Sequence, residues 1–204
     1  MEITLHILAG FLMAFIGLLP PGMLNMTTAR TSLISSFKTA IKFAAGACII
    51  VGIHAIIAFL FADYLNSNPQ IIHRLRVLGM VVMFGLSYFF WSKTKSKFKV
   101  KGKENLANPF LSGLGMSALN MLGIPFYLGM STLLAAKESI VLEPPYIYFL
   151  AIGAMIGSFS LFITYGYFAD FIDRKIGFIA RNINYILAAL FAILGISIGV
   201  NLVF

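Results

Sequence analysis

The chain has 204 residues, of which 60% are hydrophobic and 11% are charged, and its mean hydropathy is +0.94. Soluble domains carry about 25% charged residues, so this composition excludes a soluble globular protein and predicts an integral membrane protein. The net charge of +8 does not indicate nucleic-acid binding, because the basic residues lie in short segments between hydrophobic stretches. Cys48 is the only cysteine, which excludes an internal disulfide.

Six apolar stretches are long enough to cross a bilayer as helices, since about 20 residues span the hydrocarbon. We expect them at residues 5–28, 43–62, 75–91, 110–134, 146–168 and 183–203. Their apolar runs are continuous and do not alternate, which favours helices over a β-barrel. The first stretch lacks the cationic start and cleavage site of a secretory signal, so we expect it to be kept. The predicted fold class is an all-α integral membrane protein with six transmembrane helices.

The positions of lysine and arginine predict the orientation. Twelve of the fifteen basic residues follow the first, third and fifth stretches, and three follow the second and fourth. By the positive-inside rule, the larger set lies in the cytoplasm and both termini lie outside it. The lysine-rich segment from Lys93 to Lys103 is interpreted as a solvated cytoplasmic loop, with contact to anionic lipid as the alternative.

Two of the stretches contain residues that interrupt a helix. Pro20, Pro21 and Gly22 lie in the first stretch, and the segment from Asn120 to Pro125 lies in the fourth. Proline removes an amide donor and clashes with the preceding turn, so a straight helix is not expected at either place. In lipid, such a break requires protein or a water-filled cavity beside the freed backbone groups. Interrupted spans in corresponding halves are typical of a transporter's binding site.

An internal repeat relates the two halves. Asp63 and Asp170 stand in the same Phe-Ala-Asp sequence at the ends of the second and fifth stretches, and Gly46-Ala matches Gly153-Ala at the same offset. Each unit has three spans, an odd number, so the second unit is inverted relative to the first. The predicted division is a first three-helix repeat at 1–92, a basic cytoplasmic loop at 93–108 and an inverted three-helix repeat at 109–204. The first helix of each repeat is broken, and chance similarity among apolar helices is the alternative.

The backbone groups at the two breaks form the candidate substrate site. A broken helix offers amide donors at the start of its second piece and carbonyls at the end of its first, with opposite partial charges of about half an elementary charge. Together they would hold a zwitterion, and the two asparagines would add side-chain hydrogen bonds. The candidate substrate-binding residues are Pro20, Pro21, Gly22, Asn25, Asn120, Gly123 and Pro125. Two packing kinks without a ligand are the alternative.

His54 is the only ionisable residue deep within a stretch, and an intramembrane ionisable group is a functional candidate. Histidine titrates near neutral pH, so His54 is the candidate for proton coupling, with a neutral histidine bonded to a neighbouring helix as the alternative. Asp63, Asp170 and Arg30 are gating candidates, with end caps for the aspartates and a topology anchor for Arg30 as alternatives. One histidine without a carboxylate provides too few ligands for a metal, and no cofactor is expected.

Two glycine pairs allow helices to approach each other closely. They are Gly153 with Gly157, and Gly195 with Gly199. Small residues four apart let backbones come into contact in membrane helices. We expect packing within the chain, and the face of a homodimer is the alternative.

Three segments of the first half carry a family pattern. They are Gly22-Met-Leu-Asn25, Thr28-Ala-Arg-Thr-Ser-Leu33, and Gly46 followed by Gly52-Ile-His54. On these residues the chain resembles the lysine-exporter (LysE) family of amino-acid exporters over nearly its full length, and the Asn120–Pro125 segment is similar to the asparagine–proline element of that family's fourth span. The resemblance implies a non-enzymatic exporter of the bacterial inner (plasma) membrane. Many members carry an acidic residue where this chain has Ile53.

We therefore expect a secondary transporter that exports amino acids or similar small zwitterions, coupled to protons, by alternating access. A neutral substrate is favoured, because no carboxylate lies deep in a stretch to balance a second positive charge. A non-transporting membrane scaffold is the alternative. A thiol–disulfide electron carrier needs two cysteines, and a divalent-metal exporter needs more ligands than one histidine, so the sequence argues against both.

Overall fold

The structure is a computed structural model that describes residues 2–68, 106–136 and 139–172, with scattered residues between 71 and 92 and between 185 and 200. The chain divides into two compact units, residues 1–64 with 101–173 and residues 65–100 with 174–204. The predicted loop from Lys93 to Lys103 lies outside the described residues, and only scattered residues of the predicted third and sixth spans are described. The count of six spans and the division into repeats therefore stay predictions.

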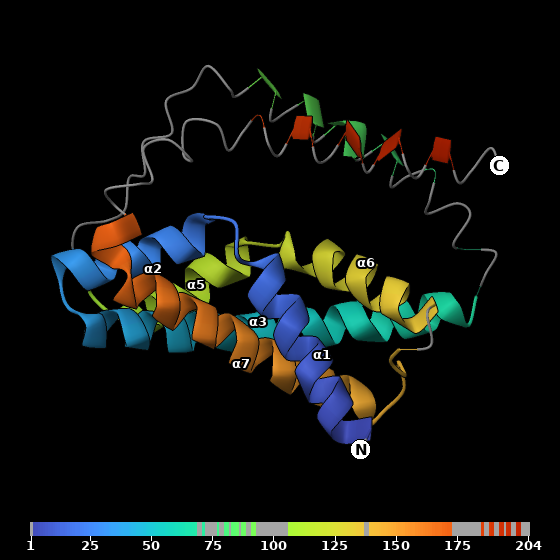
Figure 1. Cartoon of the computed structure of the whole chain (residues 1–204), viewed down its shortest axis with the longest axis horizontal. Helices are drawn as coiled ribbons and strands as arrows, with labels where there is room; N and C mark the ends of the chain where they lie inside the picture. Colours follow the sequence, from blue (N-terminus) through green and yellow to red (C-terminus); the bar gives the residue numbers. More distant parts are fainter. Residues whose placement is uncertain are drawn as a thin grey trace. The chain divides into compact units, whose positions relative to one another are not determined.

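Every regular element in the described part is a helix, as the composition predicts (Figure 1). The helices are α1 (Glu2–Gly17), α2 (Met23–Ile34), α3 (Phe37–Asn66), α5 (Pro109–Leu119), α6 (Gly123–Ala136) and α7 (Tyr146–Tyr167). Among the described residues, α3 and α7 are each long and apolar enough to cross a membrane, and α5 with α6 form a third candidate span bent by 64°. α1 has 16 residues and is about 24 Å long, short of a hydrocarbon core of about 30 Å.

Both predicted interruptions of a helix are present. α1 ends at Gly17 and α2 begins at Met23, with Gly22 in an extended conformation as the N-cap. The second break is shorter, because α5 ends at Leu119 and α6 begins at Gly123. Pro125 lies inside the first turn of α6, where an amide has no partner within the helix and a proline is tolerated. The break itself is therefore formed by residues 120–122.

α3 extends beyond the predicted second span in both directions. The hydropathy pattern predicts residues 43–62, whereas the helix runs over 30 residues from Phe37 to Asn66. Ser36 precedes its first turn, and the Ser36 hydroxyl accepts the amide of Thr39 at 3.2 Å. A serine cap of this kind stabilises a helix start in polar surroundings. The hydropathy pattern therefore located only the apolar part of α3. The helix itself continues into more polar residues at both ends.

α1 crosses α7 with their backbones in contact. A Cβ added to Gly10 would lie 2.0 Å from the carbonyl oxygen of Leu150, and one added to Gly153 would lie 2.1 Å from that of Ile7. A Cβ on Gly157 would lie 2.3 Å from the carbonyl of Phe11. Even an alanine methyl group does not fit at these positions, so glycine is what allows the crossing. The predicted packing of the Gly153 and Gly157 pair within the chain is confirmed.

α3 crosses α5 with the same local geometry. A Cβ added to Gly46 would lie 2.1 Å from the carbonyl oxygen of Phe110, and one added to Gly113 would lie 2.1 Å from that of Phe43. In both crossings, each glycine faces the carbonyl three residues before its partner glycine. The two crossings thus share one matched pair of glycine contacts, although they join different pairs of helices, and the contact of Gly157 has no glycine counterpart in the second crossing.

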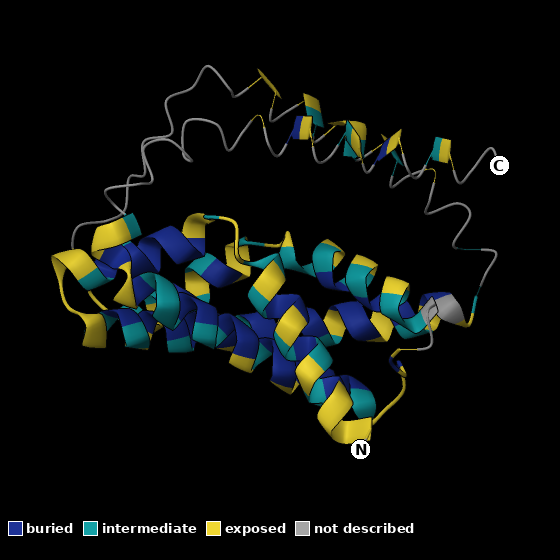
Figure 2. Ribbon diagram, in the orientation of Figure 1, coloured by how far each residue is buried: buried dark blue, intermediate teal, exposed yellow. Residues whose placement is uncertain are grey.

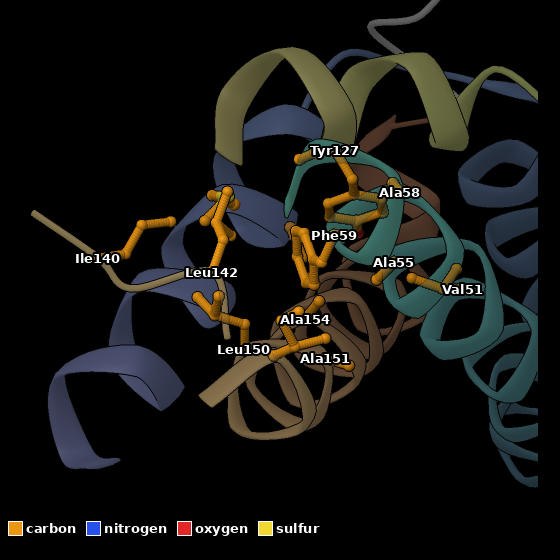
Figure 3. Packing of buried hydrophobic residues seen from close by; sticks show 14 residues of the cluster. Val51, Ala55, Ala58, Phe59, Tyr127, Ile140, Leu142, Leu150, Ala151 and Ala154 are labelled. Carbon is orange, nitrogen blue, oxygen red and sulfur yellow. The ribbon is translucent and has the colours of Figure 1, made fainter. Parts of the chain in front are cut away.

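The side chains between the helices form a mainly apolar core that also contains buried histidine, asparagine, threonine and serine side chains. Figure 3 shows Phe59 and Ala58 of α3 against Tyr127 of α6, with Leu150 and Ala154 of α7 beneath them. The opposite faces of the helices are apolar and exposed, as the outer side of α1 in Figure 2 illustrates. Apolar side chains on both faces are what a helix between a protein core and lipid requires.

In the second unit, the other glycine pair also packs within the chain. A Cβ added to Gly195 would lie 3.3 Å from the ring of Phe84, and one added to Gly199 would lie 3.3 Å from the sulfur of Met80. These contacts join the two stretches that the sequence predicts as the third and sixth spans.

Candidate functional site

Side chains of the protein close the first break. Asn25 is 2% exposed, and its Nδ2 donates to the carbonyl oxygens of Leu18 at 2.5 Å and Pro20 at 3.0 Å. The hydroxyl of Tyr165, from α7, donates to the carbonyl of Leu19 at 2.7 Å. A proline-interrupted helix leaves such carbonyls without amide partners. The Asn25 amide group is therefore bonded to the break itself in this structure, a role that the sequence did not predict.

The start of α2 presents backbone donors beside this closed break. Gly22 is the N-cap and makes no side-chain capping bond. The first amides of a helix have no partner within it and carry the positive end of its dipole. Pro20, Gly22 and Met23 are exposed, whereas Leu24 is buried. This end of α2 therefore has the chemistry of an acceptor-binding surface.

The second break is closed by backbone bonds alone in the described part of the chain. The amide of Asn120 donates to the carbonyl of Ser117 at 3.0 Å, and the carbonyl of Asn120 accepts the amide of Gly123 at a long 3.5 Å. The Asn120 side chain is half-buried and has no hydrogen bond to the described residues. An amide group that is free to bond therefore stands at this break.

His54 lies beside the second break. A Cβ added to Gly123 would lie 3.6 Å from Nδ1 of His54, so α3 and the start of α6 meet at these two residues. The imidazole is 8% exposed and has no hydrogen-bond partner among the described residues. The structure thus brings together the candidate for proton coupling and one of the candidates for substrate binding, from stretches far apart in the sequence.

The two breaks adjoin each other. Gly17, the last residue of α1, faces the ring of Phe126 in the second turn of α6, where an added Cβ would lie 2.0 Å from Cζ. Phe126 follows Pro125 directly. The interrupted segments that the sequence predicts in two different stretches therefore share one region of the first unit.

The family model of LysE type translocators matches residues 15–202 of the 204-residue chain. The chain belongs to the LysE type translocator family. It is therefore a multi-pass membrane transporter of amino acids or similar substrates, and members of this family are transporters, not enzymes. Comparison with curated proteins and with solved structures gives no match.

The two aspartate candidates of this LysE type translocator lie away from each other. Phe37, at the start of α3, packs against Tyr167, at the end of α7, with ring centroids 6.3 Å apart. The two helices are therefore antiparallel, which places Asp63 and Asp170 at opposite ends of the first unit. Arg30 is half-buried near the end of α2. These three residues do not form one site.

Two tyrosines of this translocator were not identified from the sequence. Tyr165 bonds the first break, as described above. Tyr127 is 1% exposed, and its hydroxyl oxygen is the one buried side-chain nitrogen or oxygen without a partner in the described part of the chain. The signal available in the sequence was a tyrosine in an apolar helix, where phenylalanine would satisfy packing alone.

Proposed function

We propose that this translocator exports neutral amino acids or similar small zwitterions, coupled to protons, by alternating access. The observation that carries the proposal is the meeting of two interrupted helices beside His54. In membranes, irregular backbone is tolerated where protein or a water-filled cavity covers it, and such breaks bind substrates in many transporters. In a non-transporting scaffold, unpaired polar groups at this place would cost stability and serve no function.

The substrate site in this proposal consists of the two breaks. Pro20, Pro21 and Gly22 lead into the amides of α2, and Gly123 and Pro125 begin α6. The amides at each helix start favour a carboxylate. Asn120 contributes its unbonded side chain, whereas Asn25 acts by holding the first break in shape.

A neutral substrate is supported by the buried polar side chains. Those in the described residues are histidine, asparagine, threonine and serine, without a carboxylate, a lysine or an arginine among them. A second positive charge on the substrate would need a carboxylate in such surroundings. Ile53, where the family resemblance places an acidic residue, is 46% exposed and faces away from the core.

Two inverted repeats are supported by the matched crossings. Gly46 and Gly153, which the sequence aligns, make equivalent contacts with different helices, α5 and α1. The two breaks follow Gly113 and Gly10 at nearly the same distance. In inverted-repeat transporters, one repeat moves against the other around a site at their interface.

The remaining parts of the proposal concern the surroundings of the site. His54 carries the coupling proton, and Asp63, Asp170 and Arg30 act at the two mouths. The protein lies in the bacterial inner membrane with both termini outside the cytoplasm. The segment from Lys93 to Lys103 is a solvated cytoplasmic loop in this proposal, with contact to anionic lipid as the alternative, and a homodimer is the alternative to glycine packing within the chain.

Export of labelled amino acids from loaded cells tests this function. Cells that contain the protein should lose at least one neutral amino acid faster than cells without it, and the rate should depend on external pH. His54→Gln should keep export and flatten its pH dependence. Retention that is the same with and without the protein, for neutral, acidic and basic amino acids, contradicts the proposal. An unaltered pH profile in His54→Gln removes His54 as the coupling group.

A further inference from the structure

The Tyr127 hydroxyl is the one fully buried side-chain oxygen or nitrogen that has no hydrogen-bond partner in the described part of the chain. The Asn25, Thr28, Ser131 and Ser158 side chains all donate hydrogen bonds. The Tyr127 hydroxyl is just as deeply buried and bonds nothing in the described part of the chain. A buried hydroxyl without a partner is destabilising, and phenylalanine at this position would avoid that cost. The hydroxyl therefore indicates a partner that is present in another state of the protein.

The surroundings of Tyr127 place it at the second break. Its ring is 3.9 Å at Cε2 from a Cβ added to Gly123, which also contacts His54. The ring packs edge-on against Phe59, with centroids 5.8 Å apart (Figure 3). A long side chain on a helix leans over the preceding turn, so Tyr127 is directed towards the start of α6.

The chemistry of these neighbours favours an acceptor as the missing partner. The first amides of α6 are donors and carry the positive end of the helix dipole. On α3, the imidazole of His54 lies beside the same glycine, Gly123, as the Tyr127 ring, and it is neutral or cationic. No buried carboxylate is found among the described residues. A tyrosine hydroxyl in such a place is suited to donate to an anionic oxygen.

We propose that Tyr127 determines specificity by donating a hydrogen bond from its hydroxyl to the carboxylate of the transported zwitterion. This inference rests on the proposed export of amino acids and adds a residue to that site. In the present structure the hydroxyl is covered, and it becomes accessible when α6 moves against α3 at the 64° bend that follows α5. Tyr127 thus selects for the carboxylate, which all amino acids have, and not for a particular substrate side chain.

Ligand-induced stabilisation of the purified full-length protein tests the inference. The probes are L-alanine, L-leucine and L-threonine, each measured beside its carboxamide, which has no carboxylate. The wild type should be stabilised by at least one amino acid and less by the matching amide. Tyr127→Phe keeps the ring and should unfold at the same or a higher temperature without ligand. Its apparent affinity for that amino acid should fall about tenfold or more, with little preference over the amide.

Two control variants separate the hydroxyl from packing. Tyr148→Phe removes a hydroxyl from an exposed residue of α7 and should bind like the wild type. Phe59→Leu disturbs the packing of the Tyr127 ring and keeps the hydroxyl, so it should preserve the preference for acid over amide. Equal loss of that preference in Phe59→Leu and Tyr127→Phe overturns the inference.

Wild-type affinity and preference in Tyr127→Phe also overturn it, while export stands. If the wild type neither responds to these amino acids nor exports any, the proposed function is wrong and the inference falls with it.

Discussion

The two broken helices of this translocator occupy equivalent places and are closed in different ways. α1 ends seven residues beyond the glycine of its crossing, Gly10, and α5 ends six residues beyond Gly113. Beyond the end of each helix, the two breaks differ in the hydrogen bonds that close them. Three carbonyls of the first break accept bonds from Asn25 and Tyr165. The second break has backbone bonds alone among the described residues.

This difference separates a fixed break from one that can change. Side-chain bonds to the carbonyls of residues 18–20 hold the first break in one conformation. At the second break, Asn120, His54 and Tyr127 each have a polar side chain that the described residues leave unbonded. Unbonded polar groups at one place cost stability, which a protein tolerates where a ligand or a conformational change supplies the partners.

The largest expected effect tests what the two breaks have in common. Gly113→Ala should destabilise the protein by about 3 kcal/mol, because the added methyl would overlap the backbone of α3. Gly115→Ala, two residues away on α5, meets nothing within 4 Å and should gain up to about 1 kcal/mol. Chemical unfolding in detergent measures both. Gly10→Ala should cost a similar amount, and a Gly10→Ala as stable as Gly115→Ala would contradict the matched crossings.

The second prediction concerns the difference between the breaks. Asn25→Ala removes two hydrogen bonds and leaves two carbonyls of the first break without partners, which should cost about 2–3 kcal/mol. Asn120→Ala should change the free energy of unfolding by less than about 0.5 kcal/mol. The same unfolding measurement compares the two. Equal losses of stability would show that both breaks are closed by their asparagines.

The smallest expected effect concerns the bond from α7 to the first break. Tyr165→Phe removes one donor from the carbonyl of Leu19 and should cost about 1 kcal/mol. Tyr167→Phe is the control, because this residue is 73% exposed and its hydroxyl has no hydrogen bond to the described residues. The midpoint of unfolding should shift for Tyr165→Phe and stay unchanged for Tyr167→Phe. A shift of the same size in both would assign the loss to the helix surface.

The sequence was sufficient to predict the features that depend on local backbone chemistry, such as the positions of the helix breaks. Pro20, Pro21 and Gly22 cannot continue a helix, so the first break was predictable from them. The second break was predicted over 120–125 but ends before Gly123, because a proline is compatible with the first turn of α6. The roles of Tyr165 and Tyr127 were not predictable. These roles depend on which neighbouring helix each side chain contacts, and the spacing of residues along the sequence does not predict such contacts.

The matched crossings also set an order for assembly. Gly10 packs on α7 and Gly46 packs on α5, so each helix from the first part of the chain finds its partner roughly 70–140 residues later. During synthesis, α1 and α3 enter the bilayer first, and their glycine contacts form only after α7 and α5 have emerged from the ribosome. Folding of the first unit is therefore a late event in which early helices, α1 and α3, pack against later ones, α7 and α5.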